Sequence, residues 1–145
     1  MMNLRVFCPI TDHLLSRRNT MNPTEHHVVV LGATNKPERY ANQAIRLLQE
    51  KGYSNITPVH PKLAESEGLP VANTLADVKQ PVDTLTLYVG TARLAPMTDA
   101  IVALHPGRVI FNPGTESMPL QKALDQAGIP WEEACTLVVL RTGQF

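Results

Sequence analysis

Residues 27 to 62 read HVVVLGATNKPERYANQAIRLLQEKGYSNITPVHPK and decide the fold of this 145-residue chain. The stretch opens with an uninterrupted apolar run, Val28 to Leu31, which is typical of a parallel strand buried on both faces. A single glycine, Gly32, and a polar turn follow this run, and a second apolar run from Ile56 to Val59 comes near the end. The pattern predicts two parallel strands joined by a helix.

The segment between the two runs has the period of an amphipathic helix. Its apolar residues recur at the i, i+3, i+4, i+7 spacing of one helical face: Ala41, Ala44, Ile45 and Leu48. Pro37 suits the first turn of a helix, and Gly52 suits its C-terminal end. We therefore expect the helix to lie between these two residues.

The rest of the chain continues this alternation. Further strands are expected at Val82 to Val89 and Val109 to Phe111, an edge element at Pro130-Trp131, and helices with stripes from Met97 to Leu104 and from Leu120 to Ala127. The tail CTLVVLRTGQF suits either a strand or a short helix. Alternating strands and helices predict an α/β fold, a Rossmann-like three-layer sandwich with a mostly parallel sheet of about five strands.

The chain divides into two unequal parts. Residues 1–25 show no sustained period and predict a loosely ordered N-terminal extension, for which Met21 offers an alternative start. Residues 26–145 predict one Rossmann-like domain, a normal size for a single core.

Composition excludes several classes of protein. The 13 basic and 13 acidic residues balance, which argues against a nucleic-acid or membrane partner. Cys8 and Cys135 are far apart and lack CxxC spacing, so we expect no disulfide framework and no metal site. Free thiols fit a cytoplasmic protein.

The carboxyl ends of the predicted strands carry small or polar residues. Because ligands bind at this edge of an open parallel sheet, the segments 32–35, 60–62, 90–93 and 112–116 are expected to form one site. A tight turn alone explains any one glycine in these segments, but their convergence at one edge favours a ligand site.

The turn after the first strand favours an anion. The N-terminus of the following helix presents free N–H groups and the positive end of the helix dipole, and Lys36 and Arg39 add positive charge. The alternative is that both side chains are simply solvated surface residues.

The turn departs from the dinucleotide fingerprint at two places. A GxGxxG motif requires glycines at positions where this chain has Thr34 and Pro37. The acidic residue expected after the second strand is replaced by His60 and Lys62. Bases at that position favour a ligand with an additional ribose phosphate, as in NADP or coenzyme A.

Motifs along the chain resemble a known family. The segments LGATNKPERYANQAIRLL, PVHPK, DTLTLYVG, RVIFNPGTES and ACTLVVLRTGQF are similar to those of small stand-alone CoA-binding proteins. The fold of that family is similar to the N-terminal domain of the succinyl-CoA synthetase α subunit. The resemblance covers roughly residues 27–145.

The resemblance implies coenzyme A or an acyl-CoA as the ligand. The turn after the first strand and its neighbours Arg39 and Tyr40 would meet the phosphates, Lys62 the ribose phosphate, Tyr88 to Gly90 the adenine, and Asn112 to Gly114 the pantetheine. Together with Lys36 and His60, the predicted site residues are Gly32, Ala33, Thr34, Asn35, Lys36, Arg39, Tyr40, His60, Lys62, Tyr88, Val89, Gly90, Asn112, Pro113 and Gly114.

No catalytic residue is predicted. The synthetase subunit bears its phosphorylated histidine on a second domain, to which nothing in this chain corresponds. His26 and His27 are expected to be exposed before the first strand, His105 to end a helix, Glu116 to cap the next helix, and Cys135 to be a small core residue. No nucleophile and base can be paired from the sequence.

Two other functions remain open. One is an NAD(P)-binding oxidoreductase-type domain, and the other is an interaction module with a vestigial nucleotide pocket. The apolar segment Leu137 to Leu140 would favour a homo-oligomer if it were exposed, and otherwise it fills the core.

Overall fold

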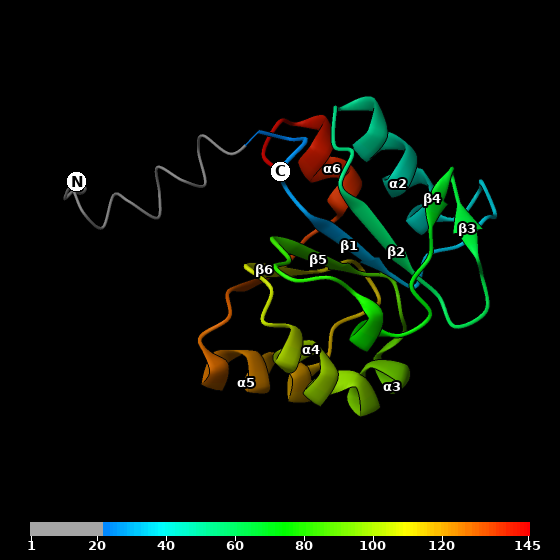
Figure 1. The fold of residues 1–145 in the computed structure, drawn as a ribbon. Helices are drawn as coiled ribbons and strands as arrows, with labels where there is room; N and C mark the ends of the chain where they lie inside the picture. Colours follow the sequence, from blue (N-terminus) through cyan, green and yellow to red (C-terminus); the bar gives the residue numbers. More distant parts are fainter. Residues whose placement is uncertain (1–21) are drawn as a thin grey trace, which may run out of the picture.

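The computed structural model describes residues 22–145, which form a parallel sheet with helices on both faces (Figure 1). The sheet has five strands in the order β2-β1-β5-β6-β7, and all four pairings are parallel. The strands are β1 Val28–Leu31, β2 Ile56–Val59, β5 Thr84–Leu87, β6 Arg108–Phe111 and β7 Trp131–Glu133. This confirms the predicted fold class.

The strand order reverses next to β1. The chain moves outward from β1 to β2 on one side, then crosses back to β5, β6 and β7 on the other. Such a reversal opens a crevice at the carboxyl ends of the two strands where the winding changes direction. In this protein these strands are β1 and β5.

Helices cover the two faces of the sheet separately (Figure 1). The elements between and after the strands are α2 Tyr40–Glu50, η2 Leu75–Asp77, α3 Thr91–Leu94, η3 Ala95–Met97, α4 Thr98–Leu104, α5 Met118–Ala127 and α6 Thr136–Arg141. A short antiparallel hairpin, β3 Glu65–Ser66 with β4 Leu69–Pro70, follows β2. Helices α2 and α6 lie on one face, and α3, α4 and α5 lie on the other.

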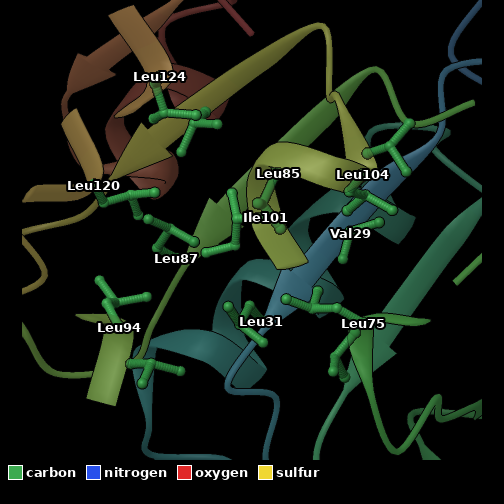
Figure 2. Packing of buried hydrophobic residues seen from close by; sticks show 14 of the residues in the cluster. Val29, Leu31, Leu75, Leu85, Leu87, Leu94, Ile101, Leu104, Leu120 and Leu124 are labelled. Atoms are coloured by element: carbon green, nitrogen blue, oxygen red, sulfur yellow. The ribbon is translucent and has the colours of Figure 1, made fainter. Parts of the chain in front are cut away.

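Alternate residues of β1 serve two different cores, because successive side chains of a strand point to opposite faces. Val28 and Val30 pack with Ile45 of α2 and Leu140 of α6. On the opposite face, apolar side chains of β1 and β5 meet those of α3, α4 and α5 (Figure 2): Val29, Leu31, Leu85, Leu87, Leu94, Ile101, Leu120 and Leu124. The uninterrupted apolar run of β1 therefore has a direct physical cause.

The element boundaries differ in places from the prediction. Helix α2 begins at Tyr40, so Pro37 lies in the preceding turn rather than in the first helical turn. Strand β5 is shorter than the expected Val82 to Val89, and the short β3–β4 hairpin was not predicted. The tail forms helix α6, in which Leu137 and Leu140 are buried and Val138 is 53% exposed.

The start of the chain is only partly described. Residues 1–21 of the predicted extension lie outside the described residues. From Asn22 onward the chain forms a turn in which the Glu25 N–H donates to the Asn22 carbonyl at 2.9 Å. None of the helices between residues 22 and 145 is long and apolar enough to cross a membrane.

The outer edge of β2 is covered by its own chain. Pro58 lacks an N–H group, and its carbonyl accepts from the Ala72 N–H at 2.9 Å. The His60 N–H then donates to the Ala72 carbonyl at 3.0 Å, and an isolated parallel bridge joins Val59 to Ala72. The segment after the hairpin thus adds a further partner beside this strand.

His27 is buried, contrary to the expectation that it would be exposed. Its ring bonds to the Pro81 carbonyl through Nδ1 at 2.8 Å and to the Thr57 hydroxyl through Nε2 at 2.7 Å. A carbonyl can only accept, so Nδ1 carries a proton and donates it to Pro81. The ring therefore joins β2 to the loop before β5.

We expect His27→Leu to lower the free energy of unfolding by about 1–3 kcal/mol, because the Pro81 carbonyl and the Thr57 hydroxyl lose their partner. His105→Asn is the control, since His105 is exposed and has a φ of 49°, which asparagine tolerates. Urea unfolding measures both variants. Equal stability of His27→Leu and the wild type would contradict the prediction.

Candidate ligand-binding site

A pocket of about 560 Å³ lies at the carboxyl ends of β1, β2, β5 and β6. It therefore occupies the crevice that the reversed strand order predicts. The residues that line it are Gly32, Ala33, Thr34, Lys36, Arg39, Tyr40, Ala41, His60, Tyr88, Val89, Gly90, Arg93, Pro113, Gly114 and Thr115. Four loops that are distant in the sequence meet here.

Gly32 brings the first of these loops against the end of β5. It has a φ of +93°, and a Cβ atom built on it would lie 2.7 Å from the Tyr88 carbonyl oxygen. Backbone atoms cannot yield in the way that the end of a flexible side chain can. Position 32 thus requires glycine both for its conformation and for this close approach.

Backbone N–H groups near the start of α2 are left without acceptors. The Gly32 and Ala33 N–H groups both donate to the Val59 carbonyl at 3.1 Å. The Arg39 side chain makes no capping hydrogen bond to α2. Among the described residues no acceptor is found for the N–H groups of Thr34, Asn35, Tyr40, Ala41 and Asn42. A helix N-terminus with free donors is suited to an anion.

The charges around the pocket have one sign. Lys36, Arg39 and Arg93 are exposed residues of its wall, and His60 is half-buried there. None of the described residues that line the pocket carries a carboxylate. The arrangement would attract phosphate groups and would disfavour a cation.

The structure also corrects the expected role of Glu116. Ser117 caps α5, since its hydroxyl oxygen accepts from the Leu120 N–H at 3.4 Å. Glu116 instead accepts from the Gly114 N–H at 3.1 Å and so braces the loop after β6. The carboxylate is engaged in the loop and does not line the pocket.

Three of the predicted site residues lie outside the pocket wall. The Asn35 amide donates to the Glu65 carbonyl at 3.0 Å, and Lys62 is exposed beyond His60. Asn112 is 2% exposed. Its Nδ2 donates to Thr86 Oγ1 at 2.7 Å and to the Leu87 carbonyl at 2.8 Å, while its Oδ1 accepts from the Thr136 N–H at 2.8 Å. The Asn112 side chain thus joins β5, β6 and α6 beneath the site.

Ala41, Arg93 and Thr115 also line the pocket but are not among the predicted site residues, although Arg93 and Thr115 belong to the segments expected at this edge. Arg93 was within reach of the sequence analysis, because it is a base in the segment that follows a strand end. It lies on α3, a helix of four residues that is too short to give a periodic signal. Ala41 was assigned only to the core face of α2.

Tyr88 lines the pocket, and its phenol oxygen is buried. Burial raises the pKa of Tyr88 to about 12, and the hydroxyls of Thr136 and Thr86 partly oppose this effect. Those two hydroxyls bond to each other at 2.7 Å. The Tyr88 oxygen is enclosed and has no hydrogen-bond partner in acceptable geometry among the described residues.

A second hollow of about 830 Å³ lies toward the amino ends of β1, β2 and β5. Its wall includes the carboxylates of Glu25, Asp77 and Asp83 together with Lys79. The described residues that line this hollow include neither the start of an α-helix nor a group of several basic side chains. The smaller pocket is therefore the better candidate for an anionic ligand, although it has the lesser volume.

Comparison with known proteins identifies the family. A model of the CoA binding domain matches residues 26–141, so the chain belongs to this family. A curated relative, the uncharacterized protein YneT of Bacillus subtilis (strain 168), is 26% identical over 61 residues. That match spans 42% of this chain and 44% of the relative.

Solved structures agree on the fold. A Thermus thermophilus protein, cell-free ID.343, is 32% identical with a TM-score of 0.75, and the match covers 86% of this chain and 100% of that one. A dinucleotide-forming acetyl-coenzyme A synthetase of Ca. Korarchaeum cryptofilum, in complex with phosphate and ADP, is 21% identical with a TM-score of 0.65. The match covers 81% of this chain and 26% of the synthetase, and at this identity it supports the fold alone.

We expect Gly32→Ala to destabilise the fold by more than Gly114→Ala. Both glycines line the pocket and have nearly equal φ values, +93° and +91°, so the conformational cost of about 1–3 kcal/mol is shared. Only at Gly32 would the new Cβ meet a backbone carbonyl, whereas at Gly114 it would meet nothing within 4 Å. Urea unfolding of the two variants checks this, and equal losses would refute the role of the Tyr88 contact.

Proposed function

We propose that this protein binds coenzyme A or an acyl-CoA in the strand-end pocket and catalyses no reaction of its own. The observation that carries the proposal is the set of groups around the pocket. Free N–H donors at the start of α2 stand beside Lys36, Arg39 and Arg93, and no carboxylate is found among the described lining residues. Membership of the CoA binding domain family supports the same ligand.

Coenzyme A has chemical groups that suit each side of the pocket. Its diphosphate would be held by the N-terminus of α2 with Lys36 and Arg39. Its ribose phosphate would lie near His60 and Lys62, the bases after β2. The pantetheine arm would leave past the loop that contains Pro113 and Gly114, the segment that the family resemblance assigns to it.

Two other functions have weaker support. An NAD(P)-dependent oxidoreductase would lack the second and third glycines of the fingerprint, at Thr34 and Pro37, and an acid after β2. An interaction module would leave the aligned donors and bases of the pocket without a purpose. A cytoplasmic location remains a prediction from the free thiols.

A homo-oligomer also remains a proposal, but less of the apolar segment at the C-terminus is exposed than that proposal requires. Leu137 and Leu140 fill the core beneath α6, which removes most of the apolar surface that motivated it. Val138 is 53% exposed on the outer side of that helix. Size-exclusion chromatography with light scattering would measure the state directly.

Calorimetric titration tests the ligand. We expect coenzyme A to bind with a dissociation constant of about micromolar order, more tightly than NAD or NADH. If Lys62 meets the ribose phosphate, Lys62→Ala will lower the affinity for coenzyme A but will leave the affinity for dephospho-CoA unchanged. Lys51→Ala is the matched control, because Lys51 is also exposed but lies at the opposite end of α2.

The results distinguish the identity of the ligand from the role of Lys62 in binding it. Tighter binding of NADH than of coenzyme A would favour the oxidoreductase alternative. Equal affinity for coenzyme A and dephospho-CoA would remove the role given to Lys62 while leaving the ligand intact. Native mass spectrometry of the freshly purified protein would show whether an acyl-CoA is already bound.

A further inference from the structure

We infer that Asn42 is a positioning residue for the anion-binding turn: it sets the orientation of the turn through the Thr34 carbonyl and does so without lining the pocket. The inference deepens the proposed function, since it concerns the affinity of the same site for phosphate groups. It adds a residue that neither the sequence motifs nor the pocket wall identifies.

The Asn42 amide is fully engaged in the interior. Asn42 is 0% exposed and lies in the first turn of α2. Its Nδ2 donates to the Thr34 carbonyl at 3.0 Å and to Glu67 Oε2 at 3.0 Å, and its Oδ1 accepts from Arg46 Nε at 2.7 Å. Burying an amide is unfavourable unless it has such partners, and these three bonds offset that cost.

In the turn, several backbone carbonyls have hydrogen-bond partners, whereas some backbone N–H groups have none among the described residues. The carbonyl oxygens of Thr34, Lys36, Pro37 and Glu38 accept from Asn42 Nδ2, Arg39 N, Arg46 Nη2 and Gln43 Nε2 respectively. Four carbonyls of the turn are thus occupied by protein donors, whereas the N–H groups of Thr34 and Asn35 have no acceptor among the described residues. A rotation that freed the Thr34 carbonyl toward the pocket would place a negative dipole beside the phosphate.

The second partner of Asn42 ties the turn to the β3–β4 hairpin. Glu67 and Gly68 have φ values of 50° and 80° at the hairpin tip, the signature of a type I′ turn. Asparagine, aspartate or glycine normally takes the first of these positions. A glutamate in this strained conformation has a reason here, because its longer side chain reaches Asn42.

Two further contacts hold the hairpin against the same turn. Asn35 Nδ2 donates to the Glu65 carbonyl at 3.0 Å, and Ser66 Oγ donates to the Thr34 carbonyl at 3.5 Å. The turn therefore lies between α2 and the hairpin. The Asn42 side chain, which belongs to α2, is bonded both to the turn at Thr34 and to the hairpin at Glu67. Pre-organising donors in this way improves anion binding because the ordering cost is met during folding.

Gln49 offers a matched control on the same helix. Its side-chain amide also donates to Glu67, to the backbone carbonyl at 3.0 Å, but it does not contact the turn. If Asn42 acts only by holding the hairpin, loss of either amide will have a similar effect on ligand affinity. If it acts through the Thr34 carbonyl, only the Asn42 variants will lose affinity.

The experiment compares Asn42→Leu, Asn42→Asp and Gln49→Leu with the wild type. Calorimetry measures the affinity of each variant for coenzyme A and for inorganic pyrophosphate. Circular dichroism with urea unfolding establishes that each variant is folded. We expect both Asn42 variants to bind coenzyme A and pyrophosphate about ten-fold or more weakly, and Gln49→Leu to stay within about two-fold. Asn42→Asp keeps the acceptor for Arg46, so it serves if Asn42→Leu does not fold.

Hydrogen exchange provides a readout without ligand. The Arg39 N–H donates to the Lys36 carbonyl at 3.0 Å inside the turn, so its exchange rate reports the turn's conformation. We expect faster exchange at Arg39 in the Asn42 variants but not in Gln49→Leu. Unchanged exchange, or equal loss of affinity in Gln49→Leu and the Asn42 variants, would overturn the inference. If the wild type binds neither ligand, the proposed function fails, and the exchange rates still decide the role of Asn42.

Discussion

The close approach of Gly32 to the Tyr88 carbonyl is the constraint on which the rest of the site depends. It brings the end of β1 against the end of β5, the two strands between which the winding of the sheet reverses. The loop after β1 leads from there into α2, and the crevice is lined by Thr34, Tyr40 and Ala41, whose N–H groups have no acceptor among the described residues. A side chain at position 32 would separate the strand ends and widen the turn.

Much of the fold could be predicted because it rests on local patterns. The run from Val28 to Leu31 has apolar residues on both faces, and this identified β1 as a strand buried on both faces without any knowledge of its neighbours. The helix α2 followed from its spacing, but its start did not, because Pro37 suits a first helical turn and a tight turn equally well. The hairpin was missed since its strands have two residues each, too few to show a period.

The residues of the candidate site could be predicted where the position of the backbone alone places them at the pocket. They could not be predicted where the side chain can point either into the pocket or into the core. Glycine and small residues after a strand end must lie at the edge of the sheet, so most of the pocket wall was found. Asn112 also follows a strand end, yet its amide turns inward to bond with Thr86 and Thr136, which are distant in the sequence. His27 and Asn42 are buried for the same reason: their partners come from tertiary contacts.

The covered edge of β2 limits how copies of this protein can associate. Strands at the border of a sheet tend to recruit a strand from another molecule through their unpaired backbone groups. Beside β2, Pro58 offers no donor and Ala72 already occupies the neighbouring positions. Continuous sheet growth from one molecule to the next on this side would first require the chain around Ala72 to leave. Assembly through helical surfaces needs no such rearrangement.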